Sequence, residues 1–104
     1  MLLPHVIRWN AVEVGQLYRD LAISAGWADR RDSETDASEA LARGFSDLLR
    51  IGSMPTTLTA ALPGTIDQTI VDTLAAEASQ QWTASFNPRT MDEASFREIY
   101  RNAI

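Results

Sequence analysis

Residues 65–89 read TIDQTIVDTLAAEASQQWTASFNPR, and this stretch decides how we expect the chain to fold. Its apolar residues recur at intervals of one, three and four positions, which predicts a helix with one buried stripe. Thr65 and Gln68 form a capping-box pattern that predicts the helix start, and Pro88 disfavours a helical residue before it. We therefore expect a long, mostly buried helix that ends in an aromatic and polar turn at 81–87, with the other helices packed on it. The stripe consists of Ile66, Ile70, Val71, Leu74, Ala75, Ala78 and Trp82.

Two helical segments are predicted at the start of the chain. Residues 1–10 place their apolar side chains on nearly one face and resemble the end of a helix rather than a whole one, because two turns are marginal in water. Residues 14–25 form the next helix, which Gly26 closes, and Trp27 is then expected to fold back on the core. The charged run 29–36 lacks apolar residues, which is typical of a solvated loop.

A third helix is expected over residues 37–49. Ser33 or Asp36 can cap its first turn. Gly44 lies on its buried side, and because a mid-helix glycine costs about 1 kcal/mol relative to alanine, we expect a close contact between helices there. Gly52 is expected to end the helix.

The remaining elements are short. Residues 56–63 have the length of one helical turn, and the capping-box pattern of Thr90 and Glu93 predicts a last helix up to Ala103. Strand-like alternation is absent from the sequence. The predicted class is all-α, with about five helices in a compact bundle that forms one domain over residues 1–104.

Composition narrows the possible functions. With 104 residues, 45% hydrophobic and 22% charged, the chain has the composition of one ordinary globular domain. Its net charge of −5 argues against a nucleic-acid or anionic-membrane partner. Cysteine is absent, the first ten residues lack the features of a signal peptide, and no run has the length of a membrane span. We therefore expect a cytoplasmic protein without thiol chemistry.

Residues of the kind that carry chemistry are sparse. His5 is the single histidine, and a zinc site usually needs three or four converging ligands, so we expect a surface or half-buried side chain without a metal. The five glycines are scattered and form no phosphate-binding loop. Asp67, Asp72 and Glu77 are expected to be solvated on the exposed side of the long helix. The residues alone thus predict a helical domain without a self-sufficient active centre, a cofactor site or a metal site.

Three segments nevertheless resemble a known family. Residues 3–10, LPHVIRWN, are similar to the Leu-Pro-His-Val-hydrophobic-Arg-aromatic-Asn segment of the iron-containing (group III) alcohol dehydrogenases. Residues 87–89, NPR, with the helix that ends in IYRNA, resemble the end of the same family, and residues 54–58, MPTTL, resemble its Ile/Leu-Pro-x-x-Leu loop. The matches follow the family's order and spacing along the whole chain.

The resemblance implies a place within a larger fold. Members of the family, like dehydroquinate synthases, have a nucleotide-binding domain followed by a C-terminal helical domain, with iron or zinc between them. This chain resembles the later part of the helical domain only, so the NAD(P) loop and the ligands, one Asp and three His, would lie before it. The family's last ligand, a histidine that opens the first helix, precedes the position of His5 by about ten residues. His5 is therefore expected at a non-ligand position, and residue 1 is expected to lie inside the family's first helix.

The resemblance also implies a substrate-facing turn. In the family, the turn before Asn-Pro-Arg approaches the substrate side of the cleft, and in this sequence that turn contains Trp82, Thr83 and Phe86. An aromatic wall with one hydroxyl suits a small alcohol or aldehyde. In the alternative interpretation, Trp82 and Phe86 close the core and Thr83 makes a local hydrogen bond.

Two functional hypotheses follow. In the first, the chain is a fragment of a metal-dependent NAD(P) alcohol dehydrogenase, inactive alone, whose partner is the missing N-terminal portion. In the second, it is a stand-alone helical module for interaction or assembly. A complete small enzyme of another chemistry is the least expected, because no nucleophile–base pair is visible. We expect the isolated chain to form a symmetric dimer through the first helix and the Trp82 turn, since an uncovered apolar face favours association.

Overall fold

A computed structural model of the chain describes residues 1–104. Every regular element in it is helical, so the predicted all-α class with about five helices is confirmed. The elements in chain order are α1 (Leu3–Ser24), α2 (Glu34–Ile51), α3 (Leu58–Ala61), α4 (Gln68–Ser79), the 3₁₀ helix η1 (Trp82–Phe86) and α5 (Glu93–Asn102).

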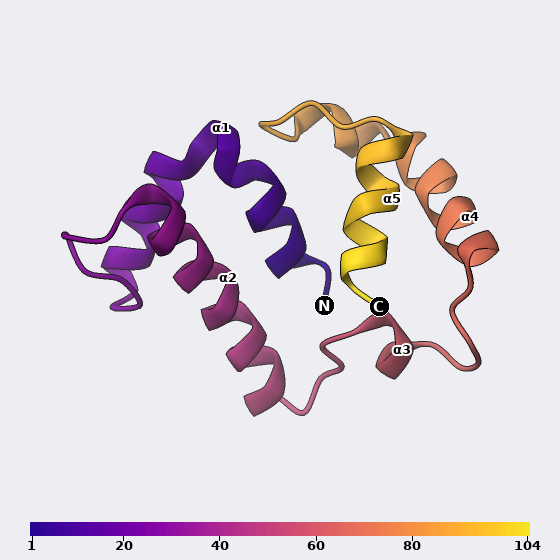
Figure 1. Cartoon of the computed structure of the whole chain (residues 1–104), viewed down its shortest axis with the longest axis horizontal. Coiled ribbons are helices and arrows are strands. Elements are labelled where there is room, and N and C mark those ends of the chain that lie inside the picture. The colour runs from indigo at the N-terminus through magenta and orange to yellow at the C-terminus, as the bar shows by residue number, and fades with distance from the viewer.

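The helices associate as two pairs. α1 packs along α2, α4 packs on α5, and a smaller contact between α1 and α5 joins the pairs (Figure 1). The result is a flat body with extents of 43 × 31 × 19 Å. The expectation that the other helices pack on residues 65–89 is wrong, because α4 has only Val71 and Ala75 buried and lies at one end of the molecule.

Helix α1 unites the two segments that were predicted as separate helices. The backbone at Val14 leaves the helical region (φ −124°, ψ 28°), so the helix continues through a kink. Its end follows the expected pattern: Gly26 has a φ of +73°, and the N–H of Trp27 donates to the carbonyl of Ala22 at 2.9 Å. This is a Schellman motif, which glycine favours because it lacks a Cβ.

Of the two candidate caps for helix α2, Ser33 and Asp36, the structure uses Ser33. The hydroxyl of Ser33 accepts from the N–H of Asp36 at 3.1 Å. Gly52 ends the helix as expected: it is the C-cap with a φ of −77°, and the residue after it, Ser53, is left-handed with a φ of 55°.

Gly44 gives space to an aromatic ring rather than to a second helix. A Cβ at this position would lie 2.2 Å from Cε3 of Trp27, whose ring packs over the glycine and meets Phe45 edge-on at 5.6 Å between centroids. The expected fold-back of Trp27 onto the core is therefore confirmed, and the expected helix–helix contact at Gly44 is corrected to a helix–tryptophan contact.

The caps of α4 and α5 lie two residues later than expected. Asp67 accepts from the N–H of Ile70 at 3.0 Å, and Asp92 accepts from the N–H of Ser95 at 2.8 Å. Aspartate caps a helix as well as or better than threonine, so it takes this role where both precede the first turn. The capping boxes predicted from Thr65 and Thr90 are therefore wrong, and α4 is shorter than the long helix expected.

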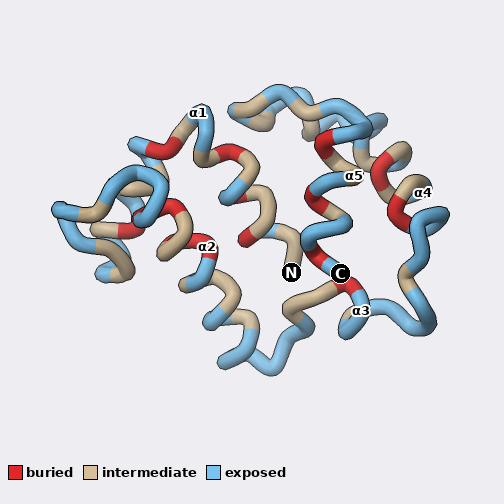
Figure 2. The backbone as a smooth tube through the Cα atoms, viewed as in Figure 1, coloured by how far each residue is buried: buried red, intermediate tan, exposed pale blue.

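The core is small because the body is thin. Fifteen of 104 residues are buried, and the buried positions line the facing sides of each helix pair (Figure 2). A consequence is that many large apolar side chains stay exposed. None of the helices combines the length and the apolar character that crossing a bilayer requires. The exposed large apolar residues are Leu3, Val12, Leu17, Leu21, Leu48, Ile51, Met54, Leu62, Ile70, Trp82, Phe86 and Ile104.

Replacing Gly44 with alanine should lower stability, although glycine to alanine within a helix ordinarily raises it by about 1 kcal/mol. The added methyl overlaps the ring of Trp27, and overpacking of this kind costs about 1–3 kcal/mol. Urea unfolding would measure the change. In the Trp27→Ala background the same substitution should no longer destabilise, and equal costs in both backgrounds would contradict the steric explanation.

Candidate functional site

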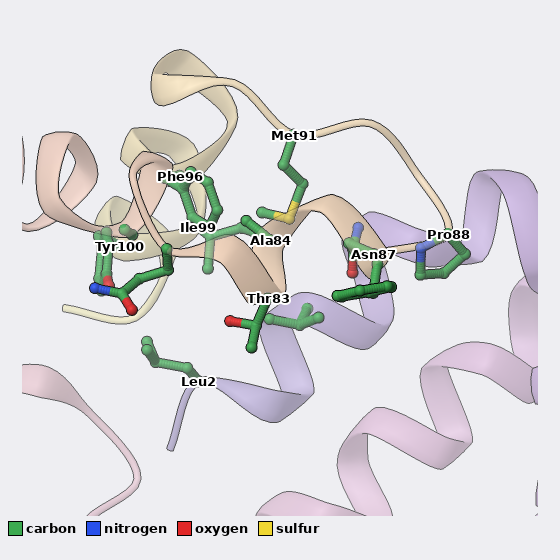
Figure 3. A pocket seen from close by; sticks show the side chains of 13 residues that line it. Leu2, Thr83, Ala84, Asn87, Pro88, Met91, Phe96, Ile99 and Tyr100 are labelled. Atoms are coloured by element: carbon green, nitrogen blue, oxygen red, sulfur yellow. The ribbon is translucent and has the colours of Figure 1, made fainter.

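An apolar groove lies where the first turn of α1, η1 and α5 meet. We call it the aromatic groove; its volume is about 450 Å³. Side chains of η1 and α5 gather above the first turn of α1, and no charged side chain lines the space (Figure 3). Its lining residues are Leu2, Val6, Ala78, Gln81, Thr83, Ala84, Phe86, Asn87, Pro88, Met91, Phe96, Ile99 and Tyr100.

Two of the three predicted site residues line this groove. Thr83 and Phe86 do so, whereas Trp82 lies beside it and meets Phe86 edge-on at 5.6 Å. Trp82 and Phe86 are each 74% exposed, so the alternative in which they close the core is wrong. The local hydroxyl bond of this turn comes from Ser85, which donates to the carbonyl of Trp82 at 2.7 Å. A role in substrate binding stays a prediction for all three residues.

A pair of asparagine side chains holds the end of η1 against α1. The amide of Asn10 donates to Asn87 at 2.9 Å, and the amide of Asn87 donates back to Asn10 at 2.7 Å. Asn10 is only 2% exposed, and its amide also approaches the hydroxyl of Tyr18 at 3.4 Å. Because a buried amide without partners is costly, this reciprocal pair fixes where the turn sits on α1.

Arg89 strengthens the same junction. Its guanidinium lies 3.6 Å from the ring centroid of Trp9, and its Nη1 donates to the carbonyl of Trp9 at 2.9 Å. That carbonyl sits in helix α1, ahead of the kink at Val14. The indole nitrogen of Trp9 is itself buried without a hydrogen-bond partner. A cation on the face of an indole is a favourable contact, so residues 87–89 bind α1 through both polar and aromatic contacts.

The single histidine faces a second, polar pocket, which Trp9 also lines. His5 shares this pocket of about 340 Å³ with Arg8, Arg89 and Glu98. Burial lowers the pKa of His5, and the positive charges of Arg8 and of the N-terminus lower it further. Two arginines disfavour a cation at this position, and no three His, Asp or Glu side chains of the chain converge in a way that would hold a metal ion.

Ion pairs bind neighbouring helices within each pair. Arg8 of α1 donates to both oxygens of Glu39 of α2, at 2.7 and 2.8 Å, and this bond lowers the pKa of Glu39. Arg97 of α5 donates to Asp72 of α4 and lowers the pKa of that carboxyl. The side chain of Asp72 is 46% exposed, as expected for a solvated residue, but it is also paired with a cation of α5 that the sequence of α4 alone does not reveal.

Sequence reasoning missed the structural role of Asn10. The residue belongs to the LPHVIRWN motif, yet it lies three positions after Ile7 and therefore on the same, buried face of the helix. A polar residue on a buried face needs a polar partner, so the sequence already indicated that Asn10 would form a hydrogen bond inside the fold. The identity of that partner, Asn87, depends on a contact across 77 positions of the chain.

Comparisons with protein-family models, with curated proteins and with solved structures give no match to this chain.

Replacing Asn87 with alanine should destabilise the chain by about 1–3 kcal/mol, because it leaves the buried amide of Asn10 without its main partner. Urea unfolding of Asn87→Ala, Asn10→Ala and the double variant would measure the coupling. Costs that simply add would show that the two amides do not act as a pair.

Because of His5, the free energy of unfolding should fall as the pH drops below about 6.5, which is the pKa of this histidine in the unfolded chain. The pKa of His5 is lowered in the folded chain, so on acidification the unfolded chain binds the proton first. Between the unfolded and the folded pKa, this proton binding favours the unfolded state. The lowered pKa of Glu39 acts at a more acidic pH, which separates the two effects. Thermal unfolding of the wild type and His5→Gln across pH 7 to 5 checks this; parallel profiles of the two proteins would contradict it.

Proposed function

We propose that this chain is the later part of the C-terminal helical domain of an oxidoreductase like the iron-containing alcohol dehydrogenases. The whole enzyme would transfer hydride between a small alcohol or aldehyde and NAD(P), with a metal polarising the oxygen. Residues 1–104 would contribute one wall of the substrate cleft and would be inactive alone.

One observation supports the proposal above the others. Two of the three segments that carry the family resemblance, residues 3–10 and 87–89, touch each other in the fold through Asn10 with Asn87 and Trp9 with Arg89. The amide pair is part-buried and joins segments that lie 77 positions apart in the chain. A contact between the resembling segments is what a common helical domain would require.

The aromatic groove adds chemical support. A small organic substrate is usually held by apolar walls with a few polar groups that orient it. Phe86 supplies an aromatic wall and Thr83 one hydroxyl, in a groove of about 450 Å³. These residues would contact the carbon chain and the hydroxyl or carbonyl of an alcohol or aldehyde.

The residues of this chain do not fit the family's metal or its nucleotide. His5 shares its pocket with two arginines, and the chain offers no convergent ligand set and no strand–turn–helix unit for a pyrophosphate. In the proposal both groups are bound by the preceding portion of the enzyme, and no reaction step is assigned to residues of this chain.

The second candidate function is a helical assembly module. It is favoured by the large apolar side chains on the surface, such as Trp82, Phe86 and Ile51, which a binding partner would cover.

The coding sequence upstream of Met1 distinguishes the two candidate functions. As the family resemblance implies, the enzyme requires an in-frame His-Gly pair about five residues upstream, preceded by a glycine-rich loop. A coding sequence without these features supports the assembly module.

The isolated chain should bind neither NADH nor stoichiometric iron or zinc, whereas a chain extended through the upstream region should oxidise small alcohols with NAD(P)⁺. Calorimetric titration, metal analysis and NAD(P)H absorbance measure the three properties. In the extended enzyme, Phe86→Ala should raise KM for the alcohol, and the exposed Val12→Ala is the matched control. Tight NADH binding by residues 1–104, or an extended chain without activity, would contradict the proposal.

A further inference from the structure

We infer that the aromatic groove and Trp82 form a self-complementary surface, through which two copies of this chain make a symmetric dimer. In this dimer the Trp82 indole of each copy fills the groove of the other. The inference does not rest on the proposed enzymatic function, because it concerns the chain as it stands.

Trp82 has the character of an interface anchor. It is 74% exposed, it lies beside the groove rather than among its lining residues, and it is supported edge-on by Phe86. Tryptophan is prominent among residues whose truncation costs most at interfaces, because its large surface is buried with little loss of entropy. The exposed indole (the knob) and the apolar groove (the hole) therefore lie side by side on the same chain.

A two-fold axis places each knob opposite the other copy's hole. In such an interface the same patch is used by both partners, so a residue and its receptor must lie on one face. Trp82 packs edge-on against Phe86, which lines the groove, so the indole lies next to the groove. A knob distant from its hole would instead generate chains or rings.

Charge does not oppose a copy of this chain at this face, although it opposes one elsewhere. Each copy carries a net charge of −5, so two copies repel each other over most of their surface. Residues 78–88, ASQQWTASFNP, contain no charged residue, and none lines the groove. Two copies therefore meet at this face without placing like charges opposite each other, whereas a basic or acidic partner would find no charge to pair with.

The exposed area matches the size of one interface. Folded monomers of this mass expose about 5,800 Å² by the usual scaling, and this chain exposes 6549 Å². The excess of about 750 Å² is close to the ~800 Å² that each partner buries in an interface of standard size. The excess belongs to the flat body as a whole, and a standard interface at this face would remove an area of about that size from each chain.

Sedimentation velocity across a dilution series of the purified chain tests the inference. The wild type should shift from dimer to monomer on dilution. Trp82→Ala should raise the dissociation constant at least about thirtyfold, as loss of an interface anchor does. Thr83→Lys should act similarly by placing two like charges in the contact, and the exposed Val12→Ala, outside the groove, should leave the constant unchanged.

Circular dichroism would show that each variant keeps its helices, which is expected because both altered side chains are exposed. In a chain labelled with fluorotryptophan, the Trp82 resonance should shift with concentration while those of Trp9 and Trp27 stay. A wild type that remains monomeric at every attainable concentration would overturn the inference. A dimer that both groove variants leave intact, or that Val12→Ala dissociates, would overturn it as well.

Discussion

The reciprocal bond between Asn10 and Asn87 is the constraint on which the arrangement depends. Each helix pair has its own buried stripe, and the contact between α1 and α5 is small. The amide pair, with Arg89 on Trp9, supplies directed bonds where apolar area is limited. Asn87 directly follows η1, so the amide pair fixes where η1 lies on α1. The positions of Thr83 and Phe86, and therefore the shape of the aromatic groove, depend on this pair.

Local patterns predicted the elements well, and contacts between elements poorly. Gly26, Ser33 and the short turn at α3 were identified correctly because each depends on a few adjacent residues. Asp67 and Asp92 were missed as caps because a threonine two residues before each of them also matches the capping-box pattern. That threonine is followed three residues later by Gln68 in one case and by Glu93 in the other. The Trp27 ring over Gly44 needs two elements to be placed in space, and no periodicity encodes that.

In the candidate site too, the local turn was predicted from the sequence and the contacts between elements were not. The turn containing Trp82, Thr83 and Phe86 was identified from its composition and from the family resemblance, and two of these residues line a groove. The remaining walls come from α5 and the first turn of α1, whose approach depends on the Asn10–Asn87 pair. Nothing within residues 65–89 indicates that pairing, so the groove itself was beyond sequence reasoning.

The division into two helix pairs also has a kinetic consequence. α1 and α2 follow each other in the chain, as α4 and α5 do, so each pair closes over a short stretch, whereas Asn10 meets Asn87 across 77 positions. Short-range contacts are entropically cheap and form early, while long-range closure comes late. The pairs should therefore behave as separate foldons, and the turn that carries the groove should be among the first regions to exchange its amide hydrogens when the two foldons part.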